Sequence, residues 1–234
     1  MSLVTTLGFD ADDTLWQNEQ FYRFTEKRFT DLLADHGAHE EISARLLEAE
    51  RRNLNFYGFG IKGFTLSMIE TAIEVTGGKT SPAVIKAILD CGREMLHHPV
   101  ELLPDVAETL AALAPHYRLV LITKGDLFDQ ERKLAQSGLG DLFDGVEIVS
   151  GKDAATYGRI FRQHGEGPDR ALMVGNSMKS DILPALAAGA FAVHVPHDLT
   201  WVLEHAETPV NHARFHHLDR LAGLPALLEE LNRS

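Results

Sequence analysis

Five short apolar runs alternate with amphipathic helical patterns along most of the chain, and this alternation constrains the fold more than any other feature. The runs are LVTTLGF (3–9), YRLVLIT (117–123), VEIVSGK (146–152), RALMVGN (170–176) and FAVHVPH (191–197). Helical patterns separate most of them, as in PDVAETLAALA and LFDQERKLAQSG. Strands that alternate with helices form βαβ units. The pattern therefore predicts an α/β, Rossmann-like parallel sheet with helices on both faces.

The segment after the first run carries only helical patterns. Four of them cover residues 18–37, 39–52, 64–78 and 81–98. The last pattern opens with Ser-Pro, a typical helix start in which the serine caps the first turn. Four helices inserted after the first strand of a sheet predict a separate helical module. We therefore expect an α/β core formed by residues 1–15 and 100–234, and a helical domain formed by residues 16–99.

Composition excludes several classes of partner. The formal net charge of -12 disfavours non-specific binding to nucleic acid or to an anionic membrane. The single cysteine, Cys91, excludes an intramolecular disulfide, and the N-terminus has no basic, apolar leader pattern. We therefore expect a cytoplasmic protein without nucleic-acid or membrane partners. The sequence leaves a monomer and a homodimer equally open.

Polar residues follow each of the first four apolar runs, at the point where the predicted strand ends. They are Asp10 and Asp12 after the first run, Thr123 after the second, Lys152 after the third, and Asn176 with Asp181 after the fourth. The carboxyl ends of parallel strands meet at one edge of a sheet. We therefore expect these side chains to converge, although they are far apart in the sequence.

These residue types together suit the chemistry of a phosphoryl group. Two unit charges 4 Å apart repel by about 4 kcal/mol at a dielectric constant of 20, so Asp10, Asp12 and Asp181 need a cation between them. Mg²⁺ prefers oxygen ligands and commonly binds one or two carboxylates together with substrate phosphate. Lys152 adds a positive charge and Thr123 a hydroxyl donor, which suit an electrophile with several oxygens. One carboxylate can then attack while another transfers a proton.

The four polar segments resemble the motifs of the haloacid dehalogenase-like hydrolase superfamily. FDADDTL is similar to the first motif, LVLIT to the second, SGKDAATYGRIF to the third and VGNSMKSDI to the fourth. Their order and spacing agree with the family over residues 5 to about 195. The resemblance implies a Rossmann-like core with an inserted α-helical cap domain of the C1 type at residues 16–99. It also implies Mg²⁺ as the cofactor and a small phosphorylated metabolite as the substrate.

The resemblance also implies a role for each matching residue. Asp10 would be the nucleophile that forms an aspartyl-phosphate, and Asp12 would protonate the leaving group and then activate water. Thr123 and Lys152 would hold the phosphoryl oxygens. Asp10, the backbone carbonyl of Asp12 and Asp181 would bind Mg²⁺.

Further substrate contacts are predicted in the turns after the first two strands and in the cap. The glycine-rich stretch NFYGFGIKGF (55–64) interrupts the cap helices, and in capped members of the family the corresponding loop often sets specificity. A plain connection with a few packing aromatic residues is the alternative for this stretch. The predicted substrate contacts are Thr14, Lys124, Gly125, Tyr57 and Lys62.

Three positions depart from the family pattern. Asp13 stands where many members have glycine, and no proline follows the third-motif lysine. Asn176 replaces the more common aspartate, which removes one negative charge from the predicted metal site. We expect Asn176 to bind the metal through water or to form a hydrogen bond with Asp181, and the Mg²⁺ affinity to be lower as a result. Asp12 is present, whereas members that cleave carbon–halogen bonds or phosphonates lack it. Phosphate chemistry is therefore the better interpretation.

Three functions stay open at this stage. A phosphatase with an aspartyl-phosphate intermediate is the leading hypothesis, and a phosphomutase would use the same residues. A non-catalytic binding or regulatory protein on the same fold is the alternative from another class. A calcium-binding EF-hand is rejected, because Leu15 and Phe21 stand where its loop needs glycine and glutamate.

Overall fold

The computed structural model describes residues 3–233, and these residues form two compact units. The sheet unit contains the described residues up to Glu19, then Val100–Lys124, then the residues from Glu131 onward. The helical unit contains Gln20–Pro99 and Gly125–Gln130. These bounds differ from the predicted domains in two places. Residues 16–19 group with the sheet, where Trp16 is buried in the core, and residues 125–130 group with the helices.

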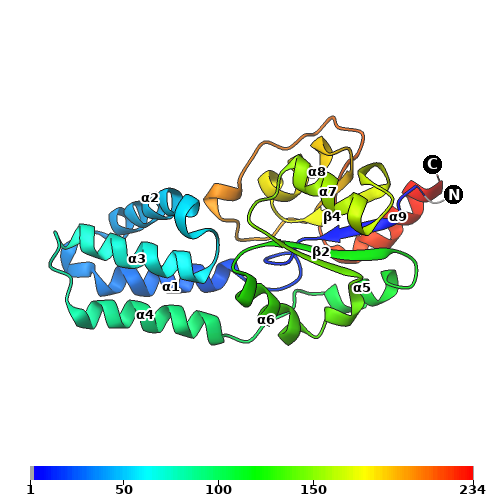
Figure 1. The fold of residues 1–234 in the computed structure, drawn as a ribbon. Helices are drawn as coiled ribbons and strands as arrows, with labels where there is room; N and C mark the ends of the chain where they lie inside the picture. The colour runs from blue at the N-terminus through cyan, green and yellow to red at the C-terminus, as the bar shows by residue number, and fades with distance from the viewer. Residues whose placement is uncertain (1–2, 234) are drawn as a thin grey trace. The chain divides into compact units, whose positions relative to one another are not determined.

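Six strands of the described chain form one parallel sheet in the order β3-β2-β1-β4-β5-β6. Figure 1 labels β2 and β4 among them. This arrangement confirms the predicted α/β, Rossmann-like fold. Five strands overlap the five apolar runs, although β2 ends one residue after its run and β3 begins one residue before its run and ends before Lys152. The sixth strand was not predicted, because its three residues carry no clear alternation. The strands are β1 (Thr6–Phe9), β2 (Arg118–Lys124), β3 (Gly145–Val149), β4 (Ala171–Gly175), β5 (Phe191–His194) and β6 (Phe215–His217).

Strand β1 lies at the centre of the sheet, between the two halves of the strand order. Phe9, its last residue, is in register with Leu121 of β2 and with Val174 of β4. On one side of β1 the sheet continues with β2 and β3, and on the other side with β4, β5 and β6. The carboxyl ends of β1 and β4 therefore flank the point where strand order reverses, which is where open parallel sheets bind ligands.

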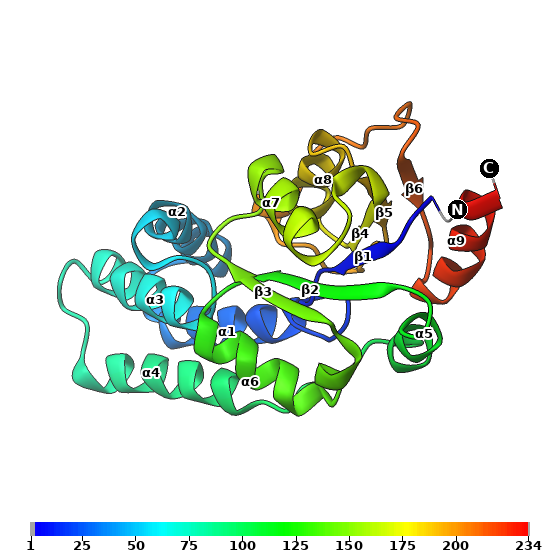
Figure 2. The ribbon, with the colours of Figure 1, turned by 45° about the vertical axis from the view of Figure 1, so that its right-hand side comes forward.

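Helices cover both faces of the sheet (Figure 2). On one face, Leu119 and Leu121 of β2 belong to a buried cluster with α5 (Val106–Leu113) and α9 (Leu224–Arg233). On the other face, the alternate residues of β2 pack in a cluster with α7 (Ala154–His164) and α8 (Leu183–Ala187). Burial on both faces explains why the strand runs are almost continuously apolar.

The helical unit packs four helices around one apolar cluster. Phe29, Ile42, Met68 and Ile88 each contribute from a different helix, and all four side chains are buried. Ser81 accepts a hydrogen bond from the Val84 backbone N–H at 3.2 Å, which confirms the predicted helix cap. The helices are α1 (Glu19–Leu32), α2 (His39–Tyr57), α3 (Ile61–Val75) and α4 (Pro82–His97).

The glycine-rich stretch 55–64 contains a much shorter loop than predicted. Helix α2 continues to Tyr57 and α3 begins at Ile61, so only residues 58–60 connect them. Gly58 has a φ of 69° and its N–H bonds to the carbonyl of Leu54, which ends the helix in a left-handed turn. Helix α6 (Leu127–Ser137) follows Gly125 in the second part of the chain. Within residues 3–233, no helix is both long enough and apolar enough to cross a membrane.

Candidate active site

The parallel strands bring three of the predicted residues to one edge of the sheet. Asp10 follows β1 directly, and its backbone N–H donates to the carbonyl of Val174 at 2.9 Å. Asn176 follows β4 directly, and Thr123 is the penultimate residue of β2. These positions follow from sheet register alone, because β1 pairs with both β2 and β4.

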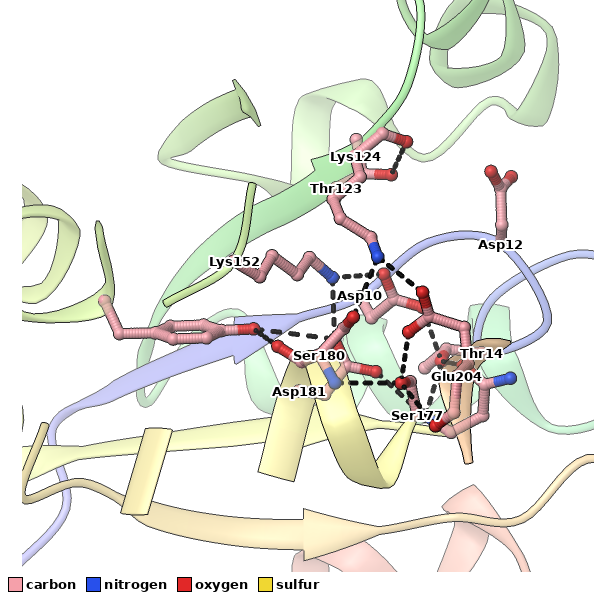
Figure 3. Close-up of polar contacts among 12 residues, drawn as sticks. Asp10, Asp12, Thr14, Thr123, Lys124, Lys152, Ser177, Ser180, Asp181 and Glu204 are labelled. Atoms are coloured by element: carbon pink, nitrogen blue, oxygen red, sulfur yellow. Dashed lines mark hydrogen bonds and ion pairs between the residues drawn. The ribbon is translucent and has the colours of Figure 1, made fainter. Parts of the chain in front are cut away.

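A buried ion cluster joins Asp10, Lys152 and Asp181 (Figure 3). The Lys152 ammonium donates to Asp10 Oδ1 at 2.5 Å and to Asp181 Oδ1 at 2.7 Å. The side chains of Lys152 and Asp181 are 1% exposed, and that of Asp10 is 10% exposed. Lys152 arrives from the loop after β3, and Asp181 from the turn after β4. Residues separated by 142 and 29 positions therefore meet at one ammonium group.

Charge in this cluster is unbalanced, since two carboxylates share one ammonium. Burial, followed by the nearby Asp181 charge, raises the pKa of Asp10 to about 7, although Lys152 opposes this rise. Burial would by itself lower the pKa of Lys152, but the carboxylates of Asp10 and Asp181 outweigh burial and raise it. The lysine therefore stays charged, whereas Asp10 keeps its proton more readily than an exposed aspartate does, and a bound cation would favour its ionised form.

A second layer of hydrogen bonds fixes the two carboxylates. The Thr14 hydroxyl donates to Asp10 Oδ2 at 3.0 Å and accepts from the Asn176 N–H at 3.1 Å. The Ser177 N–H donates to Asp181 Oδ2 at 2.9 Å. Thr14 is also a predicted substrate contact, and that role stays a prediction; in the structure its side chain is buried and its hydroxyl binds these two neighbours. Its observed contacts hold Asp10 in place.

Tyr157, on α7, lies beneath the same cluster. Its hydroxyl donates to the Ser180 carbonyl at 3.0 Å. Burial, together with the charges of Asp181 and Asp10, raises the pKa of Tyr157 well above its usual range, so the phenol stays neutral. A neutral donor at this point supports the turn that carries Asp181.

Glu204 forms a second ion pair at the edge of the site, with Lys124 (Figure 3). The Lys124 ammonium lies 2.7 Å from Glu204 Oε1 and also donates to Ser180 Oγ at 2.7 Å. The Ser177 hydroxyl donates to Glu204 Oε2 at 2.5 Å. Burial would raise the pKa of Glu204, but Lys124 and Ser177 lower it below its usual range. Glu204 therefore stays ionised and holds Lys124 against the turn after β4.

Asp12 points away from the Asp10 cluster (Figure 3). Its Oδ1 accepts hydrogen bonds from the Trp16 indole N–H at 2.7 Å and from the Lys133 ammonium at 2.9 Å. Lys133 also donates to Asn18 Oδ1 at 2.9 Å. Sequence patterns identified Asp12 but none of these partners.

The remaining predicted contacts lie in different surroundings. Thr123 is buried, and its hydroxyl lies 3.3 Å from the Lys124 carbonyl. Gly125 follows with a φ of 146°, which only glycine adopts readily. Within the helical unit, Tyr57 is half exposed, and the Lys62 ammonium binds both oxygens of Asp126 at 2.9 Å. The predicted substrate roles of these residues stay predictions.

The donor set at Asp10 fits a hard divalent cation. In the predicted site, Asp10 and Asp181 would supply carboxylate oxygens, Asn176 an amide oxygen, and Asp12 a backbone carbonyl, all of which are ligand types that Mg²⁺ prefers. A cation beside Asp10 would also favour its ionised form, since burial and the Asp181 charge raise the pKa of Asp10 to about 7. No group of three His, Cys, Asp or Glu side chains among the described residues has metal-binding geometry, so an amide or a carbonyl would have to complete the site.

Comparison with known proteins identifies the family of this chain. The sequence model of the haloacid dehalogenase-like hydrolases matches residues 4–189. The chain is 27% identical over 209 residues to the glyceraldehyde 3-phosphate phosphatase of Methanothermobacter thermautotrophicus, covering 85% of this chain and 88% of that protein. It is 24% identical over 246 residues to the human N-acylneuraminate-9-phosphatase, covering 99% and 96% of the two chains.

A solved structure is similar over nearly the whole length. The haloacid dehalogenase-like family hydrolase from Xanthomonas campestris is 41% identical and superimposes with a TM-score of 0.88. The match covers 99% of this chain and 93% of that one. The similarity therefore includes both the sheet unit and the helical unit.

Proposed function

Because the chain belongs to the haloacid dehalogenase-like hydrolase family, we propose that this phosphoric monoester hydrolase is a Mg²⁺-dependent phosphatase acting through an aspartyl-phosphate. The observation that supports this most is the buried Asp10–Lys152–Asp181 cluster, at the point where strand order reverses. Its ionised groups lie together without an evident structural need, because burying charges costs more than their pairing returns unless the geometry is excellent. Perturbed, coupled charges of this kind are typical of catalytic sites.

In the first step, a carboxylate oxygen of Asp10 attacks the phosphorus atom. The bond between phosphorus and the leaving oxygen breaks, and Asp12 gives that oxygen a proton. Lys152, Thr123 and Lys124 hold the other phosphoryl oxygens while charge redistributes among them. Bound Mg²⁺, held by Asp10, Asp181, the Asp12 carbonyl and Asn176, would supply charge neutralisation for the approach of the anionic substrate.

In the second step, water replaces the aspartate. Asp12, now ionised, takes a proton from water as the water oxygen forms a bond to phosphorus. The bond between phosphorus and Asp10 breaks, which releases inorganic phosphate and restores the Asp10 carboxylate, while Asp12 has regained its proton. A single acid–base residue thus serves both steps.

The substrate we propose is a small phosphorylated metabolite. The two curated relatives are named for glyceraldehyde 3-phosphate and for N-acylneuraminate 9-phosphate, which are both phosphate esters of small carbohydrate-type molecules. We propose that residues 16–99 act as a cap that admits such molecules and excludes bulky ones. We also propose a cytoplasmic location, with Cys91 as a buried, reduced thiol, and a monomeric or homodimeric protein.

Hydrolysis of p-nitrophenyl phosphate with added Mg²⁺ tests the proposal. The wild-type protein is expected to hydrolyse this substrate. Asp10→Asn is expected to lower kcat by about 10³-fold or more and to keep the wild-type circular dichroism spectrum. Brief reaction with ³²P-labelled substrate and acid quenching should leave label on the wild-type chain and none on Asp10→Asn. Absence of turnover by folded wild-type protein with any divalent metal would favour a binding protein instead.

A further inference from the structure

The side chain of Lys133 is buried, which is rare for lysine. It lies on α6, and its side chain is 10% exposed. Burying an ammonium group is costly unless ionised and polar acceptors replace its water. Here the acceptors include Asp12 Oδ1 and Asn18 Oδ1, both at 2.9 Å. The lysine is thus held on two sides, which makes it a rigid donor rather than a mobile surface charge.

The second donor to Asp12 is rigid as well. Trp16 is 1% exposed and belongs to the main core cluster of the sheet unit. Its indole N–H and the Lys133 ammonium both reach the same carboxylate oxygen, Oδ1, at 2.7 and 2.9 Å. A carboxylate oxygen has two lone pairs in its plane, and two donors occupy both. The proton that Asp12 exchanges must therefore reside on its other oxygen, Oδ2.

We propose that Lys133 is a positioning residue, which together with Trp16 orients Asp12 so that Oδ2 exchanges the proton during phosphoryl transfer. This inference rests on the proposed function. In the first step the Oδ2–H bond breaks as the leaving oxygen gains the proton. In the second step Oδ2 gains a proton from water, whose oxygen bonds to phosphorus while the phosphorus–Asp10 bond breaks. Lys133 touches neither the substrate nor phosphorus.

The effect of losing Lys133 on the rate should depend on the leaving group of the substrate. p-Nitrophenolate is stable as an anion and departs without being protonated, whereas an alkoxide requires a proton as it leaves. A badly oriented Asp12 should therefore slow alkyl phosphate hydrolysis much more than p-nitrophenyl phosphate hydrolysis. The ratio of kcat/KM for the two substrates isolates this effect, because kcat/KM includes only the steps up to aspartyl-phosphate formation.

Lys133→Met tests the proposal, since methionine keeps the length of the side chain and removes the donor. Lys86→Met is the matched control: Lys86 pairs with Asp90 on an exposed helix surface, at 2.7 Å, and its loss changes the net charge equally. Trp16→Phe removes the second donor and serves if Lys133→Met does not fold. Both kcat and KM are measured for p-nitrophenyl phosphate and for the alkyl phosphate that the wild type hydrolyses best.

Lys133→Met, or Trp16→Phe in its place, is expected to raise the p-nitrophenyl-to-alkyl ratio of kcat/KM by about tenfold or more, because general acid catalysis contributes about 10²–10⁴-fold. Lys86→Met is expected to leave the ratio unchanged. A folded Lys133→Met or Trp16→Phe variant in which kcat/KM falls equally for both substrates, or for neither, would overturn the positioning role and leave the proposed function standing. A wild-type protein inactive on both substrates would overturn the proposed function, and this inference with it.

Discussion

A β-carbon on Gly175 would stand 2.3 Å from the Oδ2 atom of Asp181, so the last residue of β4 has no room for any side chain. Asp181 cannot easily give way, because Lys152 and the Ser177 N–H hold its two oxygens. Glycine at position 175 therefore leaves the space that the Asp181 carboxylate occupies.

Gly175→Ala is therefore expected to displace Asp181 from the ion cluster. Overpacking of this kind costs about 1–3 kcal/mol of the free energy of unfolding. We expect kcat/KM for p-nitrophenyl phosphate to fall by about tenfold or more, because misplacing a reacting or binding group by about 1 Å can cost about 10²-fold. Denaturant unfolding and steady-state kinetics measure the two effects. Gly140→Ala is the control, since its added methyl group would meet no described atom within 4 Å beyond its chain neighbours; wild-type activity and stability in Gly175→Ala would contradict the argument.

Metal removal should abolish turnover if Mg²⁺ compensates the excess charge of Asp10 and Asp181. We expect EDTA to stop hydrolysis of p-nitrophenyl phosphate, and added Mg²⁺ to restore it. Asn176→Asp adds a carboxylate to the proposed ligand set and should lower the Mg²⁺ concentration for half-maximal activity by about threefold or more, since ligand charge tunes affinity. An unchanged or higher Mg²⁺ requirement in Asn176→Asp would argue that residue 176 lies outside the metal site.

Glu204→Gln should destabilise the sheet unit, because it replaces the carboxylate that pairs with the Lys124 ammonium by a neutral amide. The side chains of the pair are 13% and 16% exposed, so we expect a loss of about 1–3 kcal/mol, below the value for a fully buried pair. Glu41→Gln breaks an exposed pair with Arg45 and should cost less than about 0.5 kcal/mol. Urea unfolding of the two variants makes the comparison, and equal losses would show that the Glu204 pair is no stronger than a surface pair.

His216 should make stability fall in mild acid. Burial lowers its pKa below the ordinary value of 6.5, and among described residues its Nε2 atom has no hydrogen-bond partner. As pH falls through about 6.5, the unfolded chain therefore takes up a proton before the folded one does, and stability decreases until the folded-state pKa is passed. His216→Phe cannot take up this proton. We expect a shallower loss of Tm between about pH 7.5 and 5.5 in the variant than in the wild type; identical slopes would exclude this contribution.

Local sequence patterns were sufficient to predict the architecture of the sheet unit. Apolar runs of strand length, with helical periodicity between them, predicted the parallel sheet, because each strand buries both faces and each helix buries one. Asp10, Thr123 and Asn176 could be placed at one edge for the same reason. The sixth strand was missed since Phe215–His217 is too short to show alternation, and the loop at 58–60 was overestimated because two of its glycines could also cap helices.

By itself the sequence determined the fold class and which polar residues stand at the strand ends, because both depend on periodicity and on neighbours along the chain. Only the tertiary structure decided which charges pair. Lys133 meets Asp12 across 121 positions, and Lys124 meets Glu204 across 80. Such contacts depend on how helices and loops pack in three dimensions, and the energy of an ion pair comes from the burial and orientation of both partners, which no local pattern specifies.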